Sequence, residues 1–314
     1  MGTVAALEKL VPVVLAFGCG VLLARRKVVP AESSKAFSDY SFLFAVPCYL
    51  FGNIYAGDLG ALFDRRAVLG YAAAAGVAVL AVGLVSVAYG LREPRSVALR
   101  IMAAVQVNTA YFAVPVFITL FGDATPIFPI LLFQVCVLSL LVISVMELGR
   151  SDTPGGPVVR LRRAVTASLT TPLVLACNAG IVLNLLSVPV PRVLLDGFAF
   201  VGDSASPVAL FALGLHLGGF GLDLRATTRE ELAIVAFKGV GFPLLAWAVC
   251  ALVFDVEGAW LTYLVLIAAM PTPQNLFTFA QRYDVGVDLS AALVVKSSLA
   301  TLVLLPLWLQ WAAA

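Results

Sequence analysis

The chain has few charged residues for its length. Only 12% of its 314 residues are charged, whereas 61% are hydrophobic, and the mean hydropathy is +1.02. A soluble domain of this size needs far more polar surface. The net charge of +2 is too small to imply a nucleic-acid partner, and no basic stripe is present. The composition therefore favours the lipid bilayer as the surroundings of the protein.

Residues that hold metals or perform catalysis are also scarce. The only histidine is His216, and the five cysteines lie in apolar runs without metal-type spacing. An enzyme inside a membrane would need paired acids, a zinc-binding pair or a Ser/His arrangement. We therefore expect no enzyme, no bound metal and no cofactor other than a coupling H⁺ or Na⁺. A pH-sensing role for His216 stays open.

Long apolar runs recur along the whole chain. Since a helix needs roughly 20 apolar residues to cross a bilayer, they predict an all-α polytopic membrane protein with ten transmembrane helices. A linker at 150–164, rich in Pro, Gly and Arg, is expected to join a first half at 1–149 to a second half at 165–314. The runs cover residues 4–23, 36–55, 67–91, 98–121, 126–148, 165–187, 193–218, 231–254, 259–281 and 287–312.

The positive charges predict the orientation. Fourteen Lys and Arg residues lie in or beside the loops that follow odd-numbered runs, and four lie on the opposite face. Because positively charged loops remain in the cytoplasm, the odd loops should be cytoplasmic and both termini outside.

The two halves are similar at an offset of 160 residues. Pro12–Leu23 shares six of its twelve positions with Pro172–Leu183, and Pro47-Cys-Tyr-Leu-Phe51 matches Pro207-Val-Ala-Leu-Phe211. A repeat of five spans has an odd count, so its second copy must enter the membrane from the opposite face. The pattern thus predicts two inverted five-helix repeats, which are typical of transporters with a substrate site near the bilayer midplane.

Two corresponding spans contain residues that interrupt a helix. Asn108 and Pro115 lie in the fourth run, and Pro271-Thr-Pro273 lies in the ninth. Proline lacks an N–H group, and non-helical backbone at this depth persists only where protein or a hydrated cavity satisfies it. A new half-helix should start after each break, and its N-terminus attracts anions.

These breaks define the predicted site. Pro115, Pro271 and Pro273 should break the crossing helices four and nine. The alternative is that the prolines only kink the helices and the amides join neighbouring helices. The predicted substrate-binding residues are Asn108, Thr109, Gln274 and Asn275.

Three charged residues that lie well inside predicted spans are candidates for a functional role. Asp203 is placed near the midplane, and Lys238 and Lys296 lie about two helical turns from the cytoplasmic face. Intramembrane charges are costly and usually face a cavity or a partner, so we assign all three a coupling or charge-compensating role. Snorkelling lysines and a structural Asp–Lys pair are the alternatives. The residue pattern leaves open whether Asn178 and Asn184 serve packing or a cavity.

Four motifs make the chain resemble the auxin efflux carrier family, as a bacterial member of a superfamily that includes bile acid transporters. The resemblance implies ten helices in two inverted repeats with a crossover, and organic anion substrates such as auxin, malate or malonate. It implies that Asn108 and Asn275 line the site. Lys296 stands where relatives carry a small or hydroxyl residue, which implies a built-in cation. The motifs are Pro47–Phe51, Asn108–Pro115, Pro207–Gly214 and Pro271–Tyr283.

The expected function is a secondary transporter, an efflux carrier or permease, that moves small organic anions such as carboxylates by alternating access. The expected location is the bacterial inner membrane. A sodium- or proton-coupled symporter of the bile acid type is the alternative within transport, and a membrane receptor or sensor is the alternative outside it. A homodimer is a partner that the architecture allows.

Overall fold

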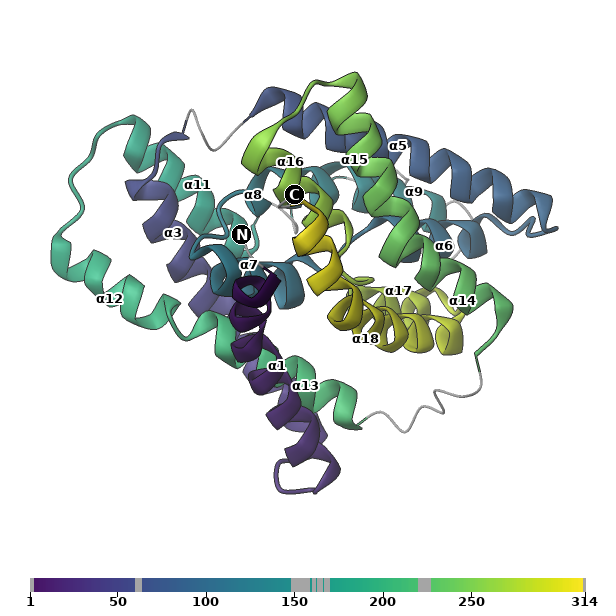
Figure 1. Ribbon diagram of the computed structural model, residues 1–314, viewed down its shortest axis with the longest axis horizontal. Coiled ribbons are helices and arrows are strands. Elements are labelled where there is room, and N and C mark those ends of the chain that lie inside the picture. The colour runs from purple at the N-terminus through teal and green to yellow at the C-terminus, as the bar shows by residue number, and fades with distance from the viewer. Residues whose placement is uncertain are drawn as a thin grey trace. The chain divides into compact units, whose positions relative to one another are not determined.

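The computed structural model describes residues 3–59, 64–147, 170–219 and 227–312, together with Val159, Arg162 and Thr166. Within these ranges the chain is helical and has no strand (Figure 1), so the all-α prediction is confirmed. Apart from Val159 and Arg162, the predicted linker at 150–164 lies outside the described residues.

Several described helices suit a membrane. Five are long and apolar enough to cross one, and four shorter helices are also apolar. The chain is therefore a multi-pass membrane protein. The long helices are Arg65–Ala88, Ile127–Met146, Arg192–Gly219, Arg229–Val253 and Val287–Trp311, and the shorter ones are Val11–Arg25, Tyr111–Phe121, Pro172–Leu185 and Gly258–Ala268.

The chain folds into two compact units, and each unit takes segments from both halves of the sequence. Unit 1 comprises residues 1–63, 109–128 and 169–222, and unit 2 comprises residues 64–108, 129–168 and 223–314. The chain passes from unit 2 to unit 1 between Asn108 and Thr109. The units therefore do not follow the sequence halves.

Unit 1 contains the first two and the sixth and seventh predicted spans. Its helices are α1 (Thr3–Arg25), η1 (Ala31–Ser33), α2 (Ser34–Tyr40), η2 (Ser41–Ala45), α3 (Val46–Ala56), η3 (Thr109–Ala113), α7 (Val114–Phe121), α11 (Pro172–Leu185), α12 (Arg192–Gly202) and α13 (Ala205–Gly219).

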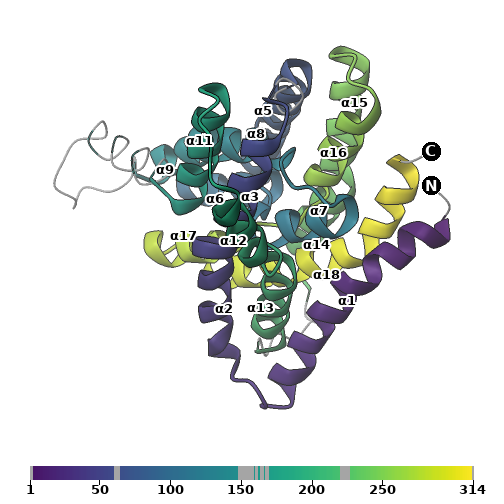
Figure 2. The same ribbon diagram turned by 90° about the vertical axis from the view of Figure 1, so that its left-hand side faces the viewer.

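Corresponding glycines of the two halves hold unit 1 together. Helix α1 packs along α13 (Figure 1) and α11 packs along α3 (Figure 2). A Cβ placed on Gly20 would lie 2.3 Å from the Phe211 carbonyl oxygen, and one on Gly180 would lie 3.1 Å from the Phe51 carbonyl oxygen. Gly20 and Gly180, like Phe51 and Phe211, are equivalent at the offset of 160 residues. In each case a glycine of one half thus lies against the phenylalanine carbonyl of the other half, and the two contacts are reciprocal.

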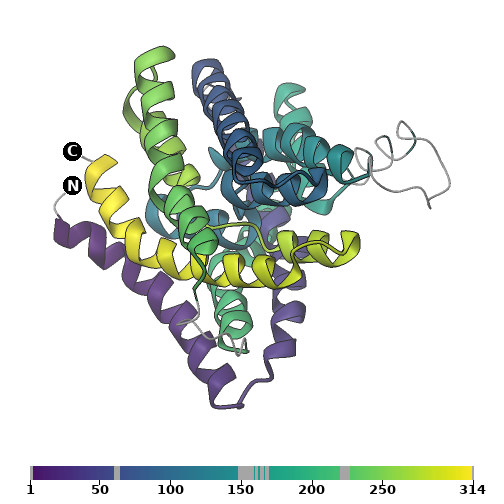
Figure 3. The same ribbon diagram turned by 90° about the vertical axis from the view of Figure 1, so that its right-hand side faces the viewer.

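Unit 2 contains the third, eighth, ninth and tenth predicted spans, the first half of the fourth and most of the fifth. Helix α5 lies beside α15 (Figure 3). The helices of unit 2 are α5 (Arg65–Ala88), α6 (Pro94–Val105), α8 (Ile127–Phe133), which begins in unit 1, η4 (Gln134–Leu138), α9 (Ser139–Glu147), α14 (Arg229–Ala236), η5 (Phe237–Gly241), α15 (Phe242–Val253), α16 (Gly258–Ala268), α17 (Asn275–Tyr283) and α18 (Val287–Ala312).

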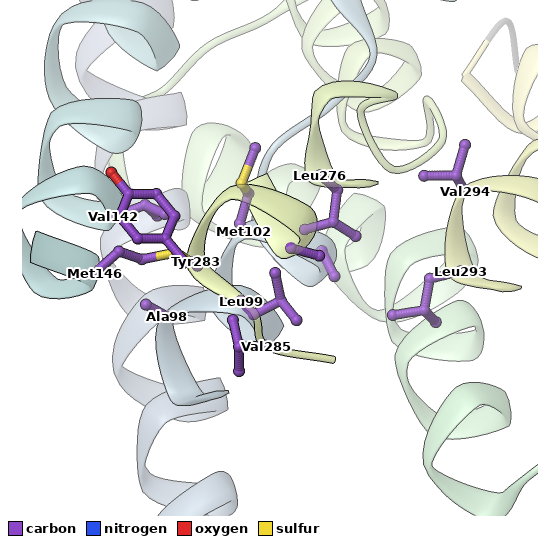
Figure 4. Packing of buried hydrophobic residues seen from close by; sticks show 12 residues of the cluster. Ala98, Leu99, Met102, Val142, Met146, Leu276, Tyr283, Val285, Leu293 and Val294 are labelled. Atoms are coloured by element: carbon purple, nitrogen blue, oxygen red, sulfur yellow. The ribbon is translucent and has the colours of Figure 1, made fainter. Parts of the chain in front are cut away.

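A buried apolar cluster joins α6 and α17 inside unit 2. Leu99 and Met102 of α6 pack near Leu276 of α17, and Tyr283 lies beside Val142 of α9 (Figure 4). In a membrane, side chains of this kind hold helices together through van der Waals packing rather than through removal from water. The cluster therefore fixes two helices that each end or begin at an interruption of the backbone.

Three π-helical segments end two residues before a proline. They are η2 before Pro47, η3 before Pro115 and η5 before Pro243. Proline removes one main-chain hydrogen bond and clashes with the carbonyl four residues earlier. A locally wider helical turn accommodates both effects without ending the helix. A proline within a span of this chain is thus compatible with a continuous helical segment.

Asn184 has a structural role. Its side-chain amide donates to the Tyr55 carbonyl oxygen at 2.7 Å and to the Gly57 carbonyl oxygen at 3.0 Å. These carbonyls lie at the C-terminal end of α3, where main-chain oxygens lack helical partners. Asn184 on α11 therefore caps α3.

Candidate functional site

The first interruption lies between α6 and η3. Helix α6 ends at Val105, and Gln106 has extended backbone angles (φ −72°, ψ 150°). The Val107 N–H donates to Gln134 Oε1 at 2.7 Å. Pro115 lies seven residues beyond Asn108, in the first turn of α7, and its carbonyl oxygen accepts from Ser206 Oγ at 2.8 Å. The chain therefore leaves the helix at residues 106–108 rather than at Pro115.

The second interruption lies between α16 and α17. Pro271, Thr272 and Pro273 are all buried and non-helical. The Thr272 N–H donates to Ser297 Oγ at 3.1 Å, and its hydroxyl donates to the Ala103 carbonyl oxygen at 2.8 Å. Gln274 is the N-cap of α17 without a side-chain capping bond, and Asn275 is the exposed first residue of that helix. Both residues thus lie where a new helix begins, as predicted.

The two interruptions meet inside unit 2. The Asn108 N–H donates to the Pro271 carbonyl oxygen at 2.8 Å. Asn108 is 2% exposed and Thr272 is fully buried. The structure therefore brings Asn108 directly against the segment that leads to Gln274 and Asn275. Thr109, by contrast, belongs to unit 1 and is half-buried.

At both breaks, an N–H group at an equivalent position finds a hydrogen-bond acceptor outside the helix. Aligning Ala103-Ala104 with Ala268-Ala269 makes Val107 the counterpart of Thr272. Each of these two residues donates its N–H to a side-chain oxygen on the next span of its own half, which is Gln134 for Val107 and Ser297 for Thr272. The unpaired backbone of a broken helix is costly in a membrane, and here it is satisfied in the same way twice.

Buried amide groups surround the first break. Gln106 is 4% exposed and Gln134 is 5% exposed. Within the described part of the chain, the side-chain amide nitrogens of these two glutamines have no hydrogen-bond partner. A buried donor without an acceptor costs about 1–3 kcal/mol, so such groups are well suited to receive a ligand that carries acceptor oxygens.

Lys238 and Lys296 have different surroundings, although both belong to unit 2. Lys238 is 1% exposed, and its Nζ lies 3.5 Å from the Val105 carbonyl oxygen. Lys296 forms an ion pair with Glu231 at 2.5 Å and donates to Thr227 Oγ1 at 3.1 Å. Glu231 also closes a capping box with Thr228 at the start of α14.

We expect Lys296→Met to destabilise the protein. Its side chain is 10% exposed and that of Glu231 is 11% exposed, and removing one partner of a largely buried ion pair costs about 3 kcal/mol. The melting temperature in detergent should fall by several degrees. The double variant Lys296→Met with Glu231→Gln should recover most of that loss, because glutamine keeps the capping box. Equal loss in both variants would contradict this assignment.

The other charged and polar candidates lie in unit 1. Asp203 is exposed between α12 and α13, and its N–H donates to the Ala199 carbonyl oxygen at 2.9 Å. Asn178 is exposed on α11, and His216 is half-buried on α13. A relation between Asp203 and either lysine stays a prediction.

Gln134, Thr272 and Glu231 were not among the predicted site residues. Gln134 is an amide within an apolar run, and Thr272 is a hydroxyl between two prolines, so both break the local pattern. Glu231 ends the sequence Thr228-Arg-Glu-Glu231, which is the signature of a capping box. Each residue thus had a local signal, but its partner is distant in the sequence.

Comparison with known proteins links this geometry to a family. A family model described as "Membrane transport protein" matches residues 5–154 and 157–309. The chain is also 30% identical over 128 residues to a Rhizobium meliloti protein named "Putative malonate transporter". That match covers 41% of this chain and 39% of the length of the relative.

Proposed function

The chain belongs to the membrane transport protein family, which is that of the auxin efflux carriers, and on this basis we propose that it is a secondary transporter of small organic anions. A transporter of this kind performs no covalent chemistry. The proposed substrates are carboxylates, and the Rhizobium meliloti relative suggests dicarboxylates such as malonate.

One observation carries the choice of site. The hydrogen bond from the Asn108 N–H to the Pro271 carbonyl oxygen joins the two interrupted helices. The N-terminus of α17 follows this junction, and helix N-termini attract anions. Asn108 and the amide nitrogens of Gln106 and Gln134 are buried donors beside it. Together they favour a ligand that is small, anionic and rich in acceptor oxygens.

The proposed architecture is that of ten spans in two inverted five-helix repeats. Two observations support it: the reciprocal contacts of Gly20 and Gly180 in unit 1, and the matching hydrogen bonds of Val107 and Thr272 in unit 2. In such repeats the site lies near the midplane and opens alternately to each side. The charge bias of the loops supports cytoplasmic odd loops and external termini in a bacterial inner membrane.

The membrane potential is sufficient to drive export in this scheme. It contributes about 2.3 kcal/mol per charge per 100 mV, so an anion leaves a negative interior without a coupled ion. Uptake against that potential requires H⁺ or Na⁺. Pro271 and Pro273 leave carbonyls of α16 without helical partners, and such carbonyls favour a sodium-coupled symporter as the second candidate.

Transport in proteoliposomes tests the proposal. Vesicles that contain purified protein and unlabelled malonate should take up labelled external malonate by exchange, whereas protein-free vesicles should not. Exchange that is equal in sodium and in choline buffer supports the uncoupled carrier, and exchange that requires sodium supports the symporter. If malonate, malate, succinate and acetate all fail to exchange, the protein is not a carboxylate transporter.

A further inference from the structure

Lys238 is a fully buried lysine, and the hydrogen bonds between the two interrupted helices do not explain its presence there. It is 1% exposed and contacts the Val105 carbonyl oxygen at 3.5 Å, with the Phe242 ring centroid 4.9 Å from its Nζ. No acidic side chain among the described residues pairs with it, since the ion pairs seen there in unit 2 are Arg100–Glu230 and Lys296–Glu231. An ammonium group with so few partners is expensive to bury.

The position of Lys238 relative to α6 suggests what it does. Val105 is the last residue of α6. The C-terminal end of a helix carries roughly half a negative charge on carbonyls that lack helical partners. Asn108 follows only three residues later. An anion held by Asn108 would therefore be repelled by the end of α6 unless a positive charge offset it.

We propose that Lys238 is a positioning residue of the anion site: its ammonium group neutralises the C-terminus of α6, so that an anion can bind at the adjoining break. This inference rests on the proposed function and identifies the fixed positive charge of that site. In other transporters with broken helices, a coupling cation occupies the freed carbonyls of half-helix C-termini. Here the Lys238 ammonium group takes the place of that cation at the C-terminus of α6.

The other broken helix lacks an equivalent charge within the described residues. Near the C-terminus of α16, the Ala269 carbonyl oxygen accepts a hydrogen bond from the Thr301 hydroxyl at 3.1 Å. A neutral hydroxyl satisfies a carbonyl without changing the local charge. Lys296 does not supply the charge either, because Glu231 neutralises it. The built-in cation implied at Lys296 is thus better assigned to Lys238.

A binding role and a structural role of Lys238 predict opposite effects on stability. Methionine has a similar length, and replacing a poorly paired buried charge by an apolar side chain of similar size is often neutral or stabilising. If Lys238 serves anion binding, Lys238→Met should melt at or above the wild-type temperature. If the lysine only supports the fold, the same change should lower the melting temperature.

The test measures malonate binding and stability together. Wild type, Lys238→Met, Lys238→Arg and the exposed control Lys35→Met are purified in detergent, and the melting temperature is recorded over a malonate titration. We expect Lys238→Met to weaken malonate binding at least tenfold without lowering the malonate-free melting temperature. Lys238→Arg should bind within a few-fold of wild type, and Lys35→Met should match it.

The outcomes separate this inference from the function on which it rests. If wild type binds malonate and Lys238→Met binds it equally well, the inference is wrong and the proposed function stands. A lower melting temperature together with lost binding also overturns it, because that result indicates a structural role. If malonate, malate, succinate and acetate all leave the melting temperature of the wild type unchanged, the proposed function fails and the inference fails with it.

Discussion

We expect Asn108→Ala to remove most of the stabilisation that malonate gives to the protein, while the protein stays folded without ligand. The side chain is 2% exposed beside the junction of the two breaks. The hydrogen bond to Pro271 uses the main-chain N–H of Asn108, so alanine retains it. Loss of one buried donor to a charged ligand costs about 1.5–3 kcal/mol, which corresponds to an affinity loss of roughly ten- to a hundredfold.

The same experiment should include Asn275→Ala and a matched control. Asn275 opens α17 and is exposed, so its replacement should weaken binding with little effect on folding. Asn178→Ala removes an exposed amide from α11 in unit 1 and should bind malonate like wild type. If Asn108→Ala and Asn275→Ala both bind like wild type, the substrate site does not lie at the interrupted helices.

Gly214→Ala should have the largest effect on stability. A Cβ at this position would lie 2.1 Å from the Phe17 carbonyl oxygen and 3.0 Å from Gly20 Cα. The contacted atoms belong to the main chain of α1, so no side chain can rotate away. Overpacking of this kind costs about 3 kcal/mol or more, and α1 must separate from α13. We expect a strongly lowered melting temperature and a poor yield of folded protein.

Gly18→Ala is the matched control, because Gly18 lies on α1, the helix that Gly214 contacts at Phe17 and Gly20. A Cβ on Gly18 meets no atom within 4 Å. Alanine is favoured over glycine in a helix by about 1 kcal/mol, so this variant should melt at or slightly above the wild-type temperature. Equal stability of Gly18→Ala and Gly214→Ala would show that α1 and α13 are not closely packed.

The sequence predicted the helices well because their signal is local. Every predicted apolar run contains described helix, and the non-helical segment at Pro271–Pro273 is the place where two prolines lie two residues apart. The interruption in the fourth run was predicted to extend from Asn108 to Pro115, and the structure has it only up to Asn108. A π-helical turn accommodates Pro115, whereas Val107 and Asn108 leave the helix because Gln134 Oε1 and the Pro271 carbonyl oxygen accept their N–H groups.

The partners of the site residues could not be predicted because they are distant in sequence. Lys238 and Lys296 looked alike as single lysines in apolar runs, and only their neighbours distinguish them. One lies against the end of α6 and the other pairs with Glu231. Conversely, the offset of 160 residues identified Gly20 and Gly180 as counterparts, but which helices they contact became clear only in the fold.

Unit 2 takes segments from both halves of the sequence, and this affects when its contacts can form during synthesis. Asn108 finds its acceptor at Pro271, which is 163 residues later (271 − 108). At about 5–20 residues per second, a ribosome needs roughly ten to thirty seconds to make that interval. During this time the main chain at Gln106–Asn108 resides in the bilayer, or at its insertion machinery, without that acceptor. The link between the two interrupted helices can therefore form only after the ninth predicted span has been made.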